Sequence, residues 1–379
     1  MSWQEKTTMS LRQEFVQLAQ VDEANMRLLC RRFAISPKTG YKWLARYAES
    51  GVSGLSDRSR RPQHCPGQTG AAIERRVIAL RAEHPTWGPR KLRVLLERGG
   101  VSPLPATSTL SAILQRHGQI EASASRAHRP FVRFEQAAPN QLWQMDFKGH
   151  FALQYGRCHP LTVLDDHARF AVGLEACPNE QTTTVQTRLR VIFTRYGLPA
   201  GMLMDNGGAW GSNQAESWTP LTVWLVRLGI AIHHGRPYHP QTQGKDERFH
   251  RTLAEEVIAQ HVLLDLSHTQ VVFDRWRDEY NLVRPHDALG LAVPASRYQP
   301  SPRAFPDRLP PIEYGSLEEV RKVQTTAEIY FHGRTYKIGH AFAGLPVALR
   351  PTEVDGLWTV YFGHQPIKTI DERTTILDN

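Results

Sequence analysis

The chain has 379 residues, 41% of them hydrophobic, and carries a formal net charge of +9 at pH 7. This length predicts two to four compact domains, and the hydrophobic content excludes a disordered protein. The longest apolar runs, such as residues 221–226, are far too short to cross a membrane, and the N-terminus lacks the apolar core of a secretory signal. Four cysteines without a CxxC pair argue against a disulfide framework or a cysteine zinc site, so we expect a cytoplasmic protein with free thiols.

The positive charge is concentrated in the first third of the chain. Residues 1–135 contain 22 Lys and Arg against 11 Asp and Glu, a net charge of +11, whereas residues 136–379 contain 24 against 26, a net charge of −2. A basic N-terminal part joined to a nearly neutral rest of the chain indicates binding of a polyanion, with nucleic acid as the first candidate. Charge alone does not separate this reading from basic helices with a solvated face.

Residues 10–50 are typical of three short helices. The second is expected over 25–33, and Ser36-Pro37 supplies a cap and a first-turn proline for the third, over 38–49. With a 3.6-residue period this third helix buries apolar residues and turns three basic ones outward, Lys38, Lys42 and Arg46. Two helices joined by a tight turn, the second with a basic outer face, predict a helix-turn-helix that enters the major groove of DNA.

Residues 51–62 are predicted to form a flexible basic linker that carries Arg58, Arg60 and Arg61. A second helical unit follows, with helices expected over 71–83, from about 87 to 97, and over 107–116. Arg90 and Lys91 lie near the start of its middle helix and are candidate DNA contacts. A three-helix bundle without a DNA role is the alternative for this unit. Residues 118–140 have no periodicity and are predicted to be a second basic linker.

Residues 141–300 alternate between strand and helix patterns. Strands are expected over 141–147, 158–165, 169–175, 200–204 and 231–234, and helices over 182–196, 218–228, 242–260 and 269–280. The order is three strands, a helix, a strand, a helix, a strand and two helices, which is that of a ribonuclease-H-like α/β fold. A Pro-rich linker follows, and the tail has alternating apolar runs with turn signals at His332-Gly333 and Asp355-Gly356, which predict a small β-barrel.

Three acidic residues lie at strand and helix ends, where such a fold usually has its functional residues. Asp146 lies in or at the end of the first strand, Asp205 at the end of an apolar strand, and Glu247 near the start of a helix. Taken singly, each has at least even odds of being a cap or turn residue.

Taken together, their surroundings resemble the DDE superfamily of integrase-core transposases and retroviral integrases. The resemblance rests on DNGG at 205–208, HPQTQGKDERFHRTL at 239–253 and YNLVRPHDAL at 280–289, and the helical front end is similar to that of bacterial insertion-sequence transposases. It implies a catalytic triad of Asp146, Asp205 and Glu247 that binds Mg²⁺, with Mn²⁺ as a substitute. One departure is the 41 residues between Asp205 and Glu247, more than the family usually has; the excess is expected within 211–220 as a longer loop.

The chemistry fits these ligands, because two Mg²⁺ ions held by carboxylates can activate a water and stabilise the leaving oxygen of a phosphodiester. The partners implied are double-stranded DNA, as terminal inverted repeats and target, and further copies of the chain on paired ends. Lys148, Lys245 and Arg248 flank the acids and are candidate phosphate contacts, with a charge-balancing surface role as the alternative. An inactive relative that regulates by binding DNA, and a nuclease that cuts without joining, are the rival functions.

The roles of several residues near the three acids also have to be assigned. Asp246 and Glu247 both open the same helix, and the resemblance favours Glu247 as the third ligand. The pair Asp165-Asp166 is not expected to hold a metal jointly, because consecutive strand side chains point to opposite faces. Trp143 and Trp210 are predicted to be packing residues, and the histidines at 233, 234 and 239 to be structural.

The expected domain plan is a helix-turn-helix domain over 1–62, a second over 63–120, a basic linker over 121–137, a ribonuclease-H-like core over 138–300, a Pro-rich linker over 301–317 and a small all-β, SH3-like barrel over 318–379.

Overall fold

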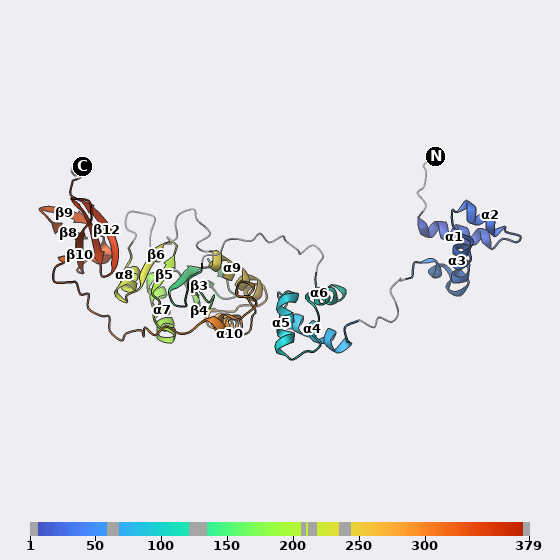
Figure 1. Cartoon of the computed structure of the whole chain (residues 1–379), viewed down its shortest axis with the longest axis horizontal. Coiled ribbons are helices and arrows are strands. Elements are labelled where there is room, and N and C mark those ends of the chain that lie inside the picture. Colours follow the sequence, from blue (N-terminus) through green and yellow to red (C-terminus); the bar gives the residue numbers. More distant parts are fainter. Residues whose placement is uncertain are drawn as a thin grey trace. The chain divides into compact units, whose positions relative to one another are not determined.

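The computed structural model describes residues 7–58, 68–120, 135–205, 210, 218–234 and 244–373. The chain divides into two compact units, Met1–Thr69 and Gly70–Asn379 (Figure 1). No helix within the described ranges is both long and apolar enough to cross a membrane.

The first unit is the predicted three-helix bundle, made of α1 (Thr8–Ala19), α2 (Met26–Arg32) and α3 (Pro37–Ser50). The Ser36 side chain accepts a hydrogen bond from Thr39 N and Pro37 occupies the first turn, as the capping pattern predicts. At Gly40 an added Cβ would lie 2.8 Å from Cys30 Sγ and from Phe15 Cζ. Glycine therefore lets α3 pack closely on the other two helices.

The segment after α3 corrects the linker prediction, because its first part is folded. Gly51–Leu55 forms a 3₁₀ turn whose Leu55 is fully buried. Arg12 Nη1 donates to Leu55 O at 2.8 Å, and a Cβ at Gly54 would lie 2.1 Å from Arg46 O. A buried leucine and a close glycine contact hold this turn on the bundle, which an exposed basic stretch in the sequence does not reveal.

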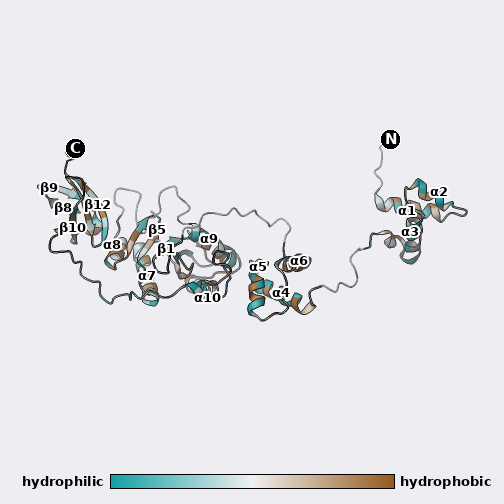
Figure 2. Ribbon diagram, in the orientation of Figure 1, coloured by the Kyte–Doolittle hydropathy of each residue, from teal (hydrophilic) through white to brown (hydrophobic). Residues whose placement is uncertain are grey.

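The second helical bundle begins the Gly70–Asn379 unit. It consists of α4 (Ala71–Glu83), α5 (Pro89–Arg98) and α6 (Thr107–Arg116), close to the predicted ranges. Its core is made of side chains from all three helices and the α4–α5 turn: Val77, Leu80, Trp87, Leu92, Leu96, Leu110, Ile113 and Leu114. In Figure 2 these helices carry both polar and apolar residues, the striped pattern expected of helices that bury one face.

The core domain is built on one mixed sheet. Its strands are β1 (Leu142–Phe147), β2 (Phe151–Ala152), β3 (Arg157–Asp165), β4 (Ala171–Cys177), β5 (Gly201–Met204) and β6 (Ala231–His234). They pair in the order β2-β3-β1-β5-β6, with β4 also on β3. The first three long strands are antiparallel, and β5 and β6 run parallel to β1. This is the predicted ribonuclease-H-like order; only the short β2 was not expected.

Helices cover both faces of this sheet. On one face lie α7 (Thr182–Tyr196) and α8 (Pro220–Arg227), and on the other lie α9 (Gly244–Leu253) and α10 (Leu266–Leu282). The helix predicted over 242–260 is interrupted, because Ala254–Ile258 is a π-helical turn. Phe249, Leu253, Phe273 and Trp276 pack together there, so both helices are fixed on the β3–β4 side of the sheet.

Described parts of two segments predicted as linkers pack against the core. Gln136 N donates to the Asp166 carboxylate at 2.8 Å, so the core begins before residue 138. In the Pro-rich segment, Arg303 donates to the carbonyls of Pro199, Leu228 and Gly229, and Phe305 lies 6.1 Å from the Phe193 ring. A rigid Pro-rich chain can lie along a surface when a few side chains anchor it, and composition alone does not reveal those anchors.

The C-terminal part is all β, as predicted. It contains β7 (Glu319–Lys322), β8 (Glu328–Phe331), β9 (Arg334–Lys337), β10 (Pro346–Pro351), β11 (Leu357–Phe362) and β12 (Gln365–Asp371). The pairing is a four-stranded sheet, β12-β11-β10-β7, and a β8-β9 hairpin that turns at His332-Gly333. Apolar residues of both sheets, including Ile329 and Val347, share one core.

Candidate active site

The sheet register places two of the predicted acids side by side. Asp146 is in β1, and Asp205 directly follows β5. These strands are parallel neighbours, with Leu142 opposite Gly201 and Gln144 opposite Leu203. Continuing that register puts Asp205 opposite Asp146, with both side chains on the same face of the sheet. Residues 59 apart in the sequence thus meet at the carboxyl end of two strands.

Negative charge is crowded around Asp146. Burial and, after it, the charges of Asp205, Glu180 and Glu247 together raise the pKa of this carboxyl to about 7. All three predicted acids therefore interact electrostatically in the fold. Glu180 is an additional acid of this site that sequence reasoning did not identify; it sits in the turn between β4 and α7, paired with His159 at 2.9 Å.

The two acids that open α9 have different surroundings. Glu247 is exposed, whereas Asp246 is only 1% exposed and its Oδ1 has no hydrogen-bond partner among the described residues. Burial raises the pKa of Asp246 well above its usual value, and the nearby charge of Asp146 raises it further. Asp246 thus points into the protein, while Glu247 is at the surface of the site.

A tryptophan holds Asp205 in place. Trp210 Nε1 donates to Asp205 Oδ1 at 2.5 Å, and the Trp210 ring stacks on Phe147 with 5.4 Å between centroids and a 5° interplanar angle. Trp210 is 1% exposed, which agrees with its predicted packing role. Its hydrogen bond to a site carboxylate was missed; the only sequence signal is that it lies five residues after Asp205.

A histidine one turn after Glu247 links α9 to the same strands. His250 Nε2 lies 2.8 Å from Thr162 Oγ1, which donates to Asp146 O at 3.0 Å. Burial and, after it, the charge of Lys148 together lower the pKa of His250 to about 4, so this imidazole is neutral at physiological pH. Sequence reasoning did not single out His250 or Thr162.

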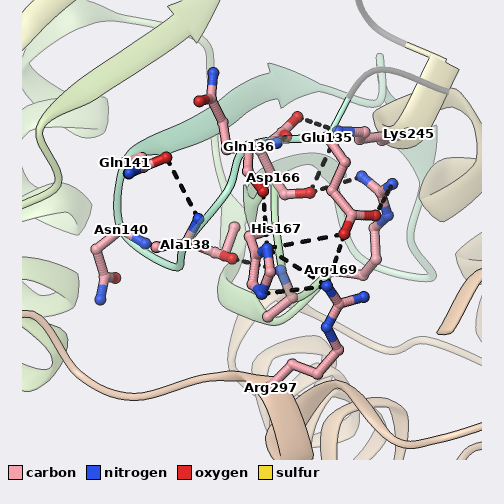
Figure 3. Close-up of polar contacts among 12 residues, drawn as sticks. Glu135, Gln136, Ala138, Asn140, Gln141, Asp166, His167, Arg169, Lys245 and Arg297 are labelled. Carbon is pink, nitrogen blue, oxygen red and sulfur yellow. Dashed lines mark hydrogen bonds and ion pairs between the residues drawn. The ribbon is translucent and has the colours of Figure 1, made fainter.

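Asp165 and Asp166, the pair that was not expected to hold a metal jointly, each accept hydrogen bonds within the core domain. Asp165 accepts from the backbone N–H groups of Asn140 and Ala168. Asp166 accepts from Gln144 and contacts Lys245 in the network of Figure 3. Lys245, a predicted phosphate contact, is thus directed into the protein.

The other predicted DNA contacts of the Gly70–Asn379 unit have varied surroundings. Arg248 is exposed and Lys148, just after β1, is partly buried. Arg90 forms an ion pair with Asp287 at 2.9 Å. Burial and, after it, the charge of Arg284 lower the pKa of Lys91 to about 8. Residues at the start of α5 therefore interact through their charges with residues that follow α10.

In the first unit, the basic residues of α3 gather around one tryptophan. Lys42 Nζ lies 4.3 Å and the Arg46 guanidinium 5.2 Å from the Trp43 ring centroid. Lys38 and Lys42 are exposed, and Arg46 is partly buried. Arg58 pairs with Glu49 at 3.0 Å. Arg60 and Arg61 lie outside the described residues, as does His239.

The donor set at Asp146 suits a hard divalent cation. Its acids offer only carboxylate oxygens, the ligands that Mg²⁺ prefers, and their mutual repulsion is what a bound cation would relieve. Within the described ranges no three acidic, histidine or cysteine side chains are already gathered at metal-binding distance. The residues present therefore fit Mg²⁺ in chemistry, with Glu247 on the open side of the site.

Parts of the chain match five domain families. Residues 136–240 and residues 228–294 each match an integrase core domain, and residues 318–377 match the C-terminal domain of IS481 family transposases. Residues 11–63 match a helix-turn-helix domain, and residues 39–114 match a homeodomain-like domain. DNA-binding helical modules, an integrase core and a transposase-type tail thus follow one another along the chain.

Two bacterial relatives come from insertion elements. The chain is 26% identical over 239 residues to an uncharacterized 31.7 kDa protein of insertion element IS407 from Burkholderia multivorans, covering 61% of this chain and 82% of that protein. It is 26% identical over 250 residues to an uncharacterized 39.2 kDa protein of insertion element IS476 from Xanthomonas euvesicatoria, covering 64% and 69%. A Pol polyprotein of radiation murine leukemia virus is 31% identical over 177 residues, 44% of this chain and 29% of the polyprotein.

Solved retroviral structures are also similar. The chain is 16% identical to the simian T-cell lymphotropic virus intasome structure, with a TM-score of 0.38 and coverage of 78% of this chain and 100% of that one. For the HTLV-2 integrase catalytic core domain in complex with magnesium the identity is 14%, the TM-score 0.34 and the coverage 43% and 99%. These TM-scores are too low to establish a fold, which follows instead from the strand order and the integrase-core matches.

Proposed function

Because this chain belongs to the DDE integrase superfamily, with the bacterial insertion-sequence transposases, we propose that it is a transposase that cuts DNA at transposon ends and joins them to target DNA with a divalent metal. The observation that carries the proposal is the meeting of Asp146 and Asp205 on adjacent parallel strands, where the charges of Asp205 and Glu247 raise the pKa of Asp146. Such crowding of acids around a partly buried carboxyl is unfavourable without a cation and is typical of a functional site.

Asp146, Asp205 and Glu247 would hold Mg²⁺, or Mn²⁺ in its place. When bound, the cations activate the attacking water or 3′-hydroxyl and stabilise the leaving oxygen. The Trp210 N–H donates to one oxygen of Asp205 and would restrain that carboxylate. Thr162 fixes the backbone at Asp146.

DNA recognition would begin at the first helical unit. The exposed Lys38 and Lys42 lie on the face of α3 opposite the buried Gly40, where a recognition helix meets DNA. Lys148 and Arg248 beside the acids would contact phosphates of the strand being cut. The substrates would be terminal inverted repeats and a target duplex in the cytoplasm, and copies of the chain would pair two ends.

The test is cleavage and joining of labelled DNA that carries a transposon end (end DNA) by the full-length protein in Mg²⁺, Mn²⁺ or EDTA. We expect nicked ends and joined products with either metal, and none in EDTA or with Asp205→Asn. Cleavage in EDTA would reject the metal mechanism. Cutting without joined products would identify a nuclease, and specific binding without cutting would identify a DNA-binding regulator.

A further inference from the structure

A buried ion pair holds the first turn of α9 to the β3–β4 hairpin. The Lys245 ammonium contacts Asp166 Oδ1 and also lies 3.3 Å from Asp166 O. The Asp166 side chain is fully buried and that of Lys245 is 17% exposed. This contact joins residues 79 apart in the sequence, so it ties the start of α9 to the turn between β3 and β4.

Asp166 is itself held rigidly (Figure 3). Gln144 Nε2 donates to its Oδ1 at 2.7 Å and Gln136 N donates to its Oδ2 at 2.8 Å. Arg169 Nη1 donates to its backbone carbonyl at 2.8 Å. Gln144 lies in β1, two residues before Asp146, so the acceptor of the Lys245 ammonium is fixed to the strand that carries a candidate metal ligand.

The remainder of α9 is fixed as well, and Glu247 lies between the fixed points. Asp246 and Phe249 are each 1% exposed and point into the protein. One turn after Glu247, His250 Nε2 contacts Thr162 Oγ1 on β3 at 2.8 Å. Glu247 is exposed and makes no comparable buried contact with the residues that the structure describes, so the position of α9 determines where this carboxylate lies.

We propose that Lys245 and Asp166 are positioning residues that set where α9 presents Glu247 to Asp146 and Asp205, and that Lys245 does not act as a phosphate contact. This inference rests on the proposed function of those three acids. The physical reason is that moving the ammonium to a DNA phosphate would leave the buried Asp166 carboxylate without its cation, a strongly unfavourable state.

The test uses full-length Lys245→Met, Asp166→Asn and the double variant. We expect each single variant to cut end DNA on the order of 10- to 100-fold more slowly, as for residues that orient metal ligands, and the double variant to be no slower than the slower single one. Affinity for end DNA and its dependence on salt should stay at wild-type values in all three. Lys148→Met is the comparison, because loss of a phosphate contact lowers the salt slope by about one.

Metal binding supplies a readout that does not depend on cleavage. Mn²⁺ titration followed by electron paramagnetic resonance should show weaker binding in Lys245→Met and in Asp166→Asn. High Mn²⁺ should restore cleavage in both, because Glu247 is still present, and should not restore it in Glu247→Gln. A general folding defect would not respond to metal in this way.

The inference is overturned if Lys245→Met binds DNA more weakly with a smaller salt slope while Asp166→Asn behaves as wild type, or if Mn²⁺ binding is unchanged in both. Thermal melting checks that each variant is folded, and Lys245→Gln replaces Lys245→Met if the latter is not. A wild-type protein that cuts no DNA would refute the proposed function instead, and the Mn²⁺ and salt measurements would still decide on the ion pair.

Discussion

Replacing Asp146 with Asn should stabilise the protein while it destroys cleavage. The carboxyl has an ordinary pKa of 3.8 and a pKa of about 7 in the fold, and its side chain is 22% exposed. Each pKa unit between the folded and unfolded states is worth about 1.4 kcal/mol, so ionised Asp146 costs the fold at most roughly 4 kcal/mol.

The direction of the pH dependence of stability follows from the protonation of Asp146. Below pH 3.8 the carboxyl is protonated in both states and costs nothing; between pH 3.8 and 7 only the unfolded chain loses the proton, so wild-type stability falls as pH rises. Asn does not titrate. The stability advantage of Asp146→Asn should therefore grow by roughly 3 kcal/mol between pH 5 and pH 8.

The assay is urea unfolding of the full-length proteins in EDTA, followed by fluorescence of the buried tryptophans of the core. Adding Mg²⁺ at pH 8 should stabilise the wild type and leave Asp146→Asn unchanged, because only the former binds the ion. A variant that is no more stable than wild type at pH 8, or one that still cuts DNA, would refute the reasoning.

Three further predictions concern other parts of the chain. Glu247→Gln should lower DNA nicking by more than about 100-fold, whereas Asp246→Asn should retain most of it because that carboxyl is buried and points into the protein; reversed results would reassign the third ligand. Lys42→Ala and Arg46→Ala should weaken binding of the terminal repeats in fluorescence anisotropy and lower the salt slope by about one per lost phosphate contact, and unchanged slopes would exclude α3 as the DNA-contacting helix. Burial lowers the pKa of His286 to about 3 from 6.5, so wild-type stability should fall by up to roughly 5 kcal/mol as pH drops through this window, and His286→Gln should lose less in acid unfolding; equal losses would contradict the shift.

The sequence determined the local structure and the kind of chemistry. Helix caps such as Ser36-Pro37, turn signals such as His332-Gly333 and the apolar periods are short-range features, and the helices and strands they predict are present in the structure. The motifs around residues 205 and 247 indicated an integrase-type core. Carboxylates at the ends of strands and helices can be recognised from the sequence without knowing which elements are neighbours in the fold. Family resemblance, and not periodicity, selected Glu247 over Asp246.

Only the tertiary structure decided which partner each polar side chain has. Lys245 and Arg248 are basic residues of the same short segment, and the sequence does not distinguish their roles. In the structure Lys245 contacts a buried aspartate 79 residues away, whereas Arg248 is exposed. Trp210 was predictable as a buried ring but not as the donor to Asp205. Periodicity tells which face of an element is buried, whereas the group that meets that face depends on the order of strands in the sheet and on elements far along the chain, and these are set only when the whole core packs.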